Sequence, residues 1–162
     1  MLDHQKPEPR HPTLAASVVA AIQGRIAMWH ALGEAVRPLR LSMVAANVFT
    51  DPEVAAVGVS QRTVDAGEVE ARVVKLPLAR NARAKMAGIT DGFVKLFARP
   101  GTGVVLGGVV VAPKASELIL PVTMAVQLGL TVDQLAQSFS VYPSLSGSLT
   151  EAGRQLMETH ND

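Results

Sequence analysis

The chain has 162 residues, of which 15 are basic, 14 are acidic and none is cysteine. That length allows one domain that buries about 70% of the surface its unfolded chain exposes. A net charge of +1 without clustered lysine or arginine argues against a nucleic-acid partner, and the lack of cysteine excludes disulfides and thiol nucleophiles. The four histidines are scattered along the sequence, so we expect no metal site.

The N-terminal part of the sequence predicts a tail followed by one apolar helix. Residues 1–12 are polar and hold three prolines, which predicts a disordered tail, no signal peptide and a cytoplasmic protein. Over residues 13–33 apolar side chains recur every three or four positions, and Gly33 stands where the helix should end. The other face of this helix is also made of small apolar residues. Because such a helix is normally buried on several sides, we expect part of its natural surroundings to be absent.

The middle of the sequence predicts strands joined by short helices. Runs of β-branched or alternating residues predict strands at 44–49, 54–59, 69–76, 92–99 and 103–112. The last run is apolar on both faces, which predicts a position at the centre of a sheet. Short helices are expected at 60–66, ended by Gly67, and at 81–87, ended by Gly88.

The C-terminal part predicts mainly helices. Residues 115–129 are expected to form one apolar helix, kinked at Pro121, and residues 131–138 a short helix with Thr131 and Gln134 as its capping box. Strands and helices are segregated along the chain. We therefore expect an α+β fold with a mostly antiparallel sheet and helices packed on one side.

The stretch from residue 139 to 157 organises the rest of the chain. Pro143 keeps Tyr142 out of the helical conformation, so the chain arrives extended before a helix begins. Ser144 is placed to cap that helix. An arm that ends in proline and leads into a near-terminal helix can present a fixed backbone carbonyl to a group outside the domain.

Three patterns resemble catalytic motifs, but structural roles fit them better. The glycine-rich pattern at 101–107 is followed by a strand instead of the helix that a phosphate loop requires, which favours a hairpin turn. Glu117 has no second carboxylate or histidine at a useful spacing, which favours a capping or interface role. The serines of 144–148 lack a nucleophile elbow and are interpreted as caps, Ser148 with Glu151 as a capping box. The residues alone indicate an exposed binding edge without a self-sufficient active site.

Five segments occur in an order that matches a known family. They are FTDPEVAAVG at 49–58, GFVKL at 92–96, GGVVV at 107–111, ASELI at 115–119 and YPSLS at 142–146. Together they resemble the C-terminal dimerisation domain of the pyridine nucleotide-disulfide oxidoreductases, a family that includes dihydrolipoamide dehydrogenase. Within it the sequence is most similar to NAD(P)H quinone reductases of the mycobacterial type, over residues 16–157.

The resemblance implies how the chain is divided. Residues 1–12 would be the tail, 13–42 a helix and linker from the end of an FAD-binding domain, and 43–162 the interface domain. Nothing before residue 13 resembles the two nucleotide-binding domains of the family, so we expect this chain to be a C-terminal portion of a longer enzyme. FAD and NAD(P)H are the implied cofactors, both bound mainly by the missing domains. The implied partners are a second copy of the chain, giving a homodimer, and those missing domains.

The resemblance also implies two contacts with the flavin. In the family, the first residue of the closing arm reaches across a two-fold interface to the partner subunit's flavin, and Tyr142 and Pro143 stand at that place. A helix that follows the family's flavin-binding motif offers backbone N–H groups to the flavin. That contact falls at Ala16, Ser17 and Val18, with a rival register two residues earlier.

Two departures from the family change the expected chemistry. Where the family has a histidine that exchanges protons with a redox dithiol, and a glutamate that orients it, this chain has Tyr142 and Gly147. A phenol with a pKa of about 10 is a poor proton acceptor near neutral pH, and glycine has no side chain to orient a partner. We expect electrons to pass to a quinone-like acceptor instead of lipoamide, and the isolated chain, which supplies no catalytic residue, to be inactive. The alternative is a free-standing or truncated dimerisation module without redox activity.

Overall fold

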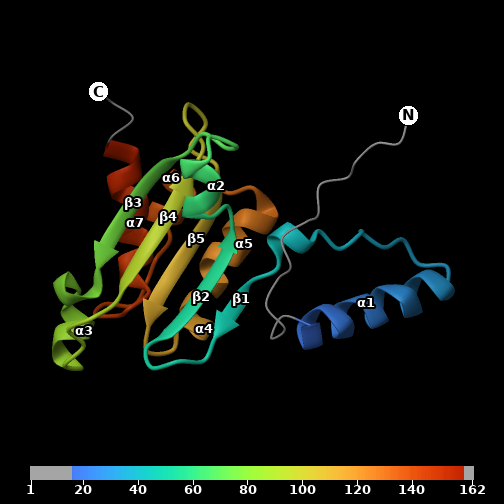
Figure 1. Ribbon diagram of the computed structural model, residues 1–162, viewed down its shortest axis with the longest axis horizontal. Helices are drawn as coiled ribbons and strands as arrows, with labels where there is room; N and C mark the ends of the chain where they lie inside the picture. Colours follow the sequence, from blue (N-terminus) through green and yellow to red (C-terminus); the bar gives the residue numbers. More distant parts are fainter. Residues whose placement is uncertain (1–15, 159–162) are drawn as a thin grey trace. The chain divides into compact units, whose positions relative to one another are not determined.

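The computed structural model describes residues 16–158, so the tail expected at 1–12 lies outside the described residues. The chain divides into two compact units, with the boundary between residues 39 and 40, and each is described by itself. The first unit contains helix α1 (Ala16–Ala31), drawn in blue in Figure 1. As the sequence predicts, Gly33 ends this helix: it adopts a φ of 81°, and Glu34 N–H donates to the Trp29 carbonyl at 3.0 Å.

The second unit is built on a five-stranded antiparallel sheet with the order β1-β2-β5-β4-β3. Its strands are β1 (Ala46–Val48), β2 (Glu53–Gly58), β3 (Arg72–Pro77), β4 (Phe93–Ala98) and β5 (Val105–Ala112). The predicted central position of the apolar strand is confirmed, since β5 lies between β2 and β4 (Figure 1). Gly107 allows the chain at the end of β2 to approach β5 closely: a Cβ there would lie 2.5 Å from the backbone nitrogen of Val59.

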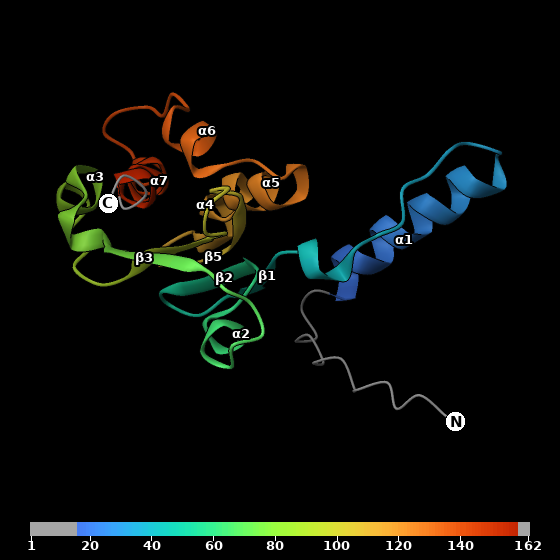
Figure 2. The same cartoon turned by 90° about the horizontal axis from the view of Figure 1, so that it is seen from above.

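Helices cover mainly one face of this sheet. They are α2 (Gln61–Asp65), α3 (Ala82–Met86), α4 (Ala115–Leu118), α5 (Leu120–Leu128), α6 (Val132–Ala136) and α7 (Gly147–Glu158), with 3-10 turns η2 (Leu41–Met43) and η3 (Leu78–Arg80). Figure 2 shows α4, α5, α6 and α7 on one side of the sheet and α2 on the other. The α+β fold with an antiparallel sheet and packed helices is thus confirmed. No helix in this part of the chain is both long and apolar enough to cross a membrane.

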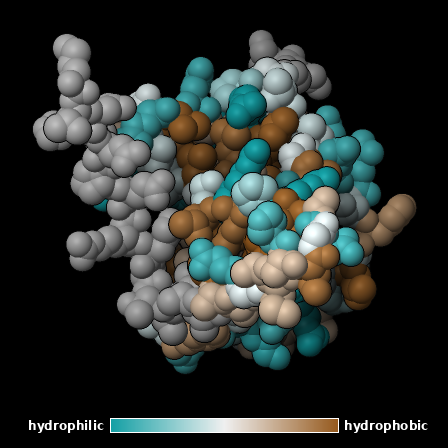
Figure 3. Space-filling model, turned by 90° about the vertical axis from the view of Figure 1, so that its right-hand side faces the viewer, coloured by the Kyte–Doolittle hydropathy of each residue, from teal (hydrophilic) through white to brown (hydrophobic). Residues whose placement is uncertain are grey.

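The core lies between the sheet and the helices on its covered face. Its fully buried large side chains include Val94, Leu96, Val105, Val110, Val122, Leu149 and Leu156. Burial of such side chains is the main source of stability in a domain of this size. Other large apolar side chains reach the surface, and Figure 3 shows hydrophobic residues exposed among hydrophilic ones on the face that it draws.

Side-chain caps form at the starts of three helices, and the capping box of α6 was predicted from the sequence. Ser60 accepts from Thr63 N–H at 3.2 Å at the start of α2. Asn81 caps α3 in the same way, and the Thr131–Gln134 capping box of α6 forms with both of its hydrogen bonds. Side-chain oxygens at these positions satisfy backbone N–H groups that the helix leaves without partners.

Two expectations about the C-terminal helices were wrong. The helix predicted at 115–129 is divided at Ile119 into α4 and α5. Pro121 lies in the first turn of α5, where a missing N–H costs no intrahelical bond, so it begins a helix instead of kinking one. Ser148 is not the start of a capping box with Glu151, because it lies inside α7 and its hydroxyl accepts a hydrogen bond from Asn81.

Candidate functional site

The arm, residues 139–143, connects α6 to α7 and is strongly exposed. Among the large apolar side chains of the described residues, the three with the greatest exposure lie on this arm: Phe139 at 107%, Tyr142 at 85% and Val141 at 79%. The Tyr142–Pro143 peptide bond is cis. Exposed aromatic and aliphatic side chains concentrated on one short segment are typical of a surface that contacts another molecule.

Hydrogen bonds hold the chain firmly directly after the arm. Ser144 Oγ accepts from Gly147 N–H at 3.2 Å, which confirms the predicted cap at the entry to α7. The Asn81 amide nitrogen donates to the Ser144 carbonyl at 2.9 Å and to Ser148 Oγ at 2.8 Å. The Asn81 amide oxygen accepts from Ala84 N–H at 3.1 Å. One side chain therefore joins the start of α3, the end of the arm and the first turn of α7.

Sequence analysis did not identify this second role of Asn81. The sequence predicted a short helix over residues 81–87 and no cap at Asn81, whose local partner, Ala84 N–H, lies three residues away. Its other partners, Ser144 and Ser148, are 63 and 67 residues away, and no spacing pattern in the sequence connects them. An asparagine side chain has an acceptor oxygen and two donor hydrogens, and a cap uses only the oxygen. The two unused donors were the available indication that Asn81 has further hydrogen-bond partners.

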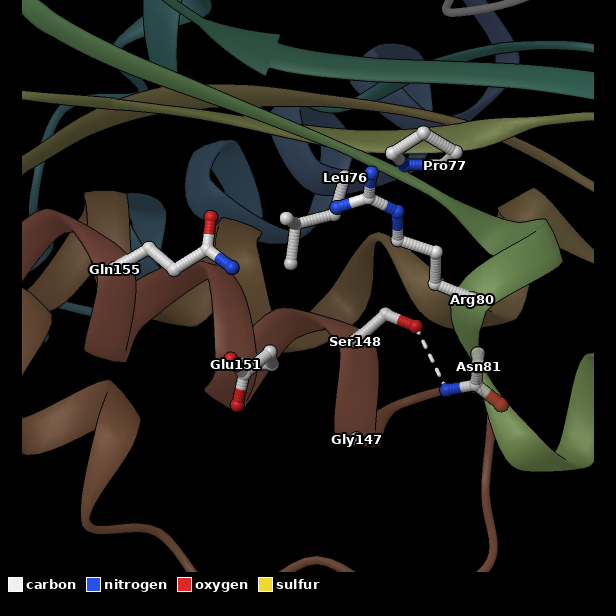
Figure 4. A pocket seen from close by; sticks show the side chains of 8 residues that line it. All are labelled: Leu76, Pro77, Arg80, Asn81, Gly147, Ser148, Glu151 and Gln155. Atoms are coloured by element: carbon white, nitrogen blue, oxygen red, sulfur yellow. Dashed lines mark hydrogen bonds between the residues drawn. The ribbon is translucent and has the colours of Figure 1, made fainter.

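Gly147 lies beside a shallow pocket of about 280 Å³ between α7 and the end of β3 (Figure 4). The pocket is lined by Leu76, Pro77, Arg80, Asn81, Gly147, Ser148, Glu151 and Gln155. A Cβ built on Gly147 would lie 3.6 Å from Ser144 Oγ and 3.8 Å from Ser140 Oγ, which are ordinary contact distances. Space for a side chain therefore exists at Gly147.

The charged group that the fold perturbs most clearly is Glu53, at the start of β2. Its carboxylate accepts from Ser116 N–H at 2.9 Å and from Ser116 Oγ at 2.7 Å. These hydrogen bonds, assisted by the charge of Lys114, lower the pKa of the Glu53 carboxyl against a smaller opposing effect of desolvation. Glu53 thus ties β2 to the start of α4. Glu117, predicted to have a capping or interface role, lies in the first turn of α4 and is exposed.

The other predicted contact, at Ala16, Ser17 and Val18, belongs to the first unit. The backbone of these residues is helical in α1, and the rival register at residues 14 and 15 lies outside the described part of the chain. Within residues 16–158 no cluster of three or more histidine, aspartate or glutamate side chains could hold a metal ion.

Comparisons with known proteins agree with this architecture. A sequence profile described as the pyridine nucleotide-disulphide oxidoreductase dimerisation domain matches residues 44–153. The NAD(P)H dehydrogenase (quinone) of Mycobacterium tuberculosis is 64% identical over 149 residues, which are 92% of this chain and 30% of the relative. The dihydrolipoyl dehydrogenase of Geobacillus stearothermophilus is 32% identical over 150 residues, covering 91% of this chain and 31% of the relative.

Solved structures give the same result. LpdA from Mycobacterium tuberculosis superimposes with a TM-score of 0.85 at 66% identity, covering 87% of this chain and 31% of that one. The HOCl-induced flavoprotein disulfide reductase RclA from Escherichia coli gives a TM-score of 0.77 at 27% identity, covering 85% and 32%. The chain thus spans about 30% of the length of these relatives. Since the family profile covers both the sheet and most of the helices that pack on it, the chain belongs to the pyridine nucleotide-disulphide oxidoreductase family and represents its dimerisation domain.

Proposed function

We propose that this chain is the C-terminal dimerisation part of an FAD-dependent oxidoreductase that transfers a hydride from NAD(P)H to a quinone-like acceptor. The observation that carries the proposal is the exposed arm ending in Tyr142 and Pro143, firmly held from Ser144 onward. The 64% identity to a NAD(P)H dehydrogenase (quinone) supports the choice of acceptor. FAD, when bound by the preceding domains of the enzyme, supplies the two-electron relay between NAD(P)H and the acceptor.

The role of the arm in this proposal is to complete the flavin site of a second subunit. Tyr142 is exposed in its own unit, so its backbone carbonyl is available to accept a hydrogen bond from a flavin N–H group. The hydrogen bonds at Ser144 fix the direction in which the arm leaves the domain. A contact of this kind makes the homodimer the working form of the enzyme, since neither subunit completes its own site.

The first unit would supply the second contact. The backbone of Ala16, Ser17 and Val18 lies in α1, and N–H groups at the start of a helix favour a partner with negative charge. Only backbone atoms are needed there, so the identity of these side chains is unimportant. The residues present therefore fit a flavin through one carbonyl and a short run of amide groups.

The residues around the arm also limit which acceptor is used. Reduction of a disulfide such as lipoamide needs a group that takes up and returns protons, and acid–base assistance typically accelerates such steps by about 10²–10⁴-fold. Tyr142 offers a phenol where such a step needs a proton acceptor, and a phenol is in general a poor base near neutral pH, while Gly147 leaves no carboxylate on the first turn of α7. Hydride transfer to a quinone does not require a dithiol partner, so it is the reaction least affected by these two replacements.

The test uses a chimeric enzyme. Residues 16–162 of this chain would replace the corresponding C-terminal segment of the Mycobacterium tuberculosis NAD(P)H dehydrogenase (quinone), which matches it at 64% identity. We expect the chimera to oxidise NAD(P)H with a quinone at least about 100-fold faster than with lipoamide. Equal rates with the two acceptors would refute the proposal. A well-folded chimera that binds FAD and reduces neither acceptor would favour a dimerisation module without redox activity.

A second measurement concerns the chain alone. Mixed with FAD and passed through a desalting column, it should retain no flavin absorbance, because the arm and α1 supply only part of a site. Retained flavin at a stoichiometric level would show that the chain forms a complete pocket by itself. That result would contradict the role proposed for the arm.

A further inference from the structure

The helices leave one face of the sheet largely open, since only α2 lies on that side (Figure 2). Side chains alternate between the two faces of a strand, and Ala55, Val94 and Val110 belong to the core on the helix-covered side. Their neighbours along each strand therefore point to the other side, where they form two rows that cross all five strands. These residues are called the open face below: Val48, Val54, Val111, Phe93 and Pro77 in one row, and Ala46, Ala56, Val109, Lys95 and Lys75 in the other.

The open face is apolar except for its two lysines. Val48 and Val54 are 41% and 36% exposed, and most of the other apolar members are half-buried. An antiparallel sheet with one solvated face normally alternates apolar residues inward with polar residues outward. A continuous apolar surface on the outward side is typical of a region that another molecule covers.

The two lysines lie directly opposite each other. Lys75 on β3 pairs in register with Lys95 on β4, so their side chains emerge about 5 Å apart. Lys75 Nζ lies 4.2 Å from the ring centroid of Phe93, which is also on the open face. Within residues 16–158 neither lysine forms an ion pair with a carboxylate. Like charges directly opposite on neighbouring strands are destabilising, so a carboxylate placed between the two lysines would be favoured.

Helix α2 forms a wall at one end of the open face. Its first residue, Gln61, accepts from Lys95 Nζ at 3.1 Å, and Phe97, two residues further along β4, is fully buried. Figure 2 shows α2 standing out from this side of the sheet. A planar membrane surface would meet α2 before it reached the two rows of the open face, whereas a polypeptide segment can lie beside α2.

We propose that the open face binds an acidic amphipathic helix of a partner protein. The apolar side of that helix covers the valines and Phe93, and its carboxylates meet Lys75 and Lys95. The charge of the open face selects this occupant, because both of its charged groups are cations and a helix with acidic residues supplies their counter-charges. The inference goes beyond the proposed function and does not rest on it.

The dimensions of the open face agree with such a helix. Neighbouring strands lie about 4.8 Å apart, so five strands span about 19 Å, which is the length of about 13 residues of α-helix. Acidic residues four positions apart on a helix present side chains about 5–6 Å apart, which matches the spacing of Lys75 and Lys95. The small side chains of Ala46 and Ala56 allow a helix to approach the sheet closely.

The experiment measures the binding of two matched helical peptides of about 18 residues to the purified 162-residue chain by fluorescence anisotropy. Both peptides carry leucines on one side of the helix and glutamines on the other. The acidic peptide has two glutamates four residues apart where the neutral peptide has glutamines. We expect the acidic peptide to bind about tenfold more tightly, a gain that two ion pairs at a surface can supply. Lys75→Gln combined with Lys95→Gln should abolish this preference, because the glutamates then meet no charge.

Lys85→Gln is the matched control for the lysine variants. Lys85 is exposed on α3 and is not part of the open face, so this variant should keep the full preference for the acidic peptide. Far-UV circular dichroism checks that every variant is folded. If the double variant does not fold, Lys75→Gln alone, which changes an exposed side chain, should reduce the preference to about threefold.

A second pair of variants tests the apolar rows. Val54→Thr combined with Val111→Thr should weaken the binding of both peptides about fivefold or more, since each change places a hydroxyl in the contact. Val141→Thr makes the same change on the exposed arm and should alter the binding of neither peptide. The opposite pattern would place the peptides on the arm and overturn the inference.

Other results would also overturn the inference. These are equal binding of the two peptides, a preference that survives in the double lysine variant, and no binding of either peptide at about 1 mM. Cosedimentation with phosphatidylserine vesicles that the double lysine variant abolishes would assign the open face to a membrane instead. Self-association of the chain that the same variant abolishes would assign it to a second copy. The acceptor preference of the chimera decides the proposed function independently of these results.

Discussion

Replacing Asn81 by alanine tests how the arm is anchored. The substitution removes the acceptor that caps α3 at Ala84 N–H and the two donor contacts to the Ser144 carbonyl and Ser148 Oγ. Asn81 is half-buried and Ser148 is only 5% exposed. Water therefore cannot fully replace the lost partners.

The expected loss of stability follows from the three bonds. Removing an N-cap costs about 1 kcal/mol, and each ordinary hydrogen bond contributes about 0.5–1.5 kcal/mol net, with a larger cost where a buried partner is left unsatisfied. For Asn81→Ala we expect a decrease of about 2–4 kcal/mol in the free energy of unfolding. That is a large share of the roughly 5–15 kcal/mol that stabilises a typical domain.

The measurement is urea unfolding followed by far-UV circular dichroism, with Ser60→Ala as the matched control. Ser60 caps α2 by the same kind of bond, to Thr63 N–H, in an exposed position, so its loss should cost only about 1 kcal/mol. Asn81→Asp should fall between the two, because it keeps the acceptor and lacks the donors. Equal losses for Asn81→Ala and Ser60→Ala would show that the long-range bonds contribute nothing, and would refute the anchoring argument.

Three further predictions concern other parts of the domain. Hydrogen bonds from Ser116 lower the pKa of the Glu53 carboxyl in the folded protein. The stability that they contribute is fully present above the unfolded carboxyl pKa of about 4.3 and is lost as the pH falls through the lower folded pKa. The difference in urea midpoint between wild type and Glu53→Gln should therefore shrink as the pH is lowered over that range. Gly107→Ala should cost about 3 kcal/mol or more in urea unfolding, because the new Cβ would lie 2.5 Å from the Val59 nitrogen. In the chimera, Tyr142→Phe should keep the quinone reductase rate within about threefold, since the arm is expected to act through its backbone carbonyl.

Each of these has a control and a contradicting result. Glu117→Gln removes an exposed carboxylate in the first turn of α4 and is the matched substitution for comparison. A Glu53→Gln variant with the same pH dependence of unfolding as wild type would contradict the lowered pKa of Glu53. Gly24→Ala, where nothing lies within 4 Å of the new Cβ, should be nearly neutral. A Gly107→Ala variant as stable as wild type would contradict the close approach of Val59, at the end of β2, to β5. A loss of quinone reduction beyond about tenfold in Tyr142→Phe would assign a chemical role to the phenol.

Features that depend on neighbours in the sequence were predictable. A cap lies three residues from the N–H group it serves, so the capping box of Thr131 with Gln134 and the cap at Ser144 could be predicted from the sequence. The central position of β5 followed from its apolar sequence, because a strand covered on both faces needs no polar side. The sheet order could not be obtained in this way, since it depends on contacts between distant residues, such as the pairing of Gly58 with Gly107.

The errors arose where one residue type serves two purposes. Proline destabilises the middle of a helix but is favoured in its first turn. Because the sequence around Pro121 does not show where a helix begins, it could not distinguish these two positions. Ser148 matched a capping pattern with Glu151, but a partner 67 residues away uses its hydroxyl. The flavin contacts at Ala16–Val18 and Tyr142 stay predictions, since they depend on a second subunit and on other domains.

The arm combines features that normally exclude each other. Its apolar side chains are exposed, so they contribute no burial free energy to the isolated domain. The chain directly after the arm is nevertheless fixed by a hydrogen bond from Asn81 and by the Ser144 cap. Binding to a flexible segment costs about 0.5–1.5 kcal/mol of conformational entropy for each side chain that becomes immobilised. A segment held at one end has already lost part of its conformational entropy before the partner binds. Loosening the anchor should therefore weaken docking without removing any contact with the partner. For that reason Asn81, although it is not expected to touch the flavin, matters to the proposed function.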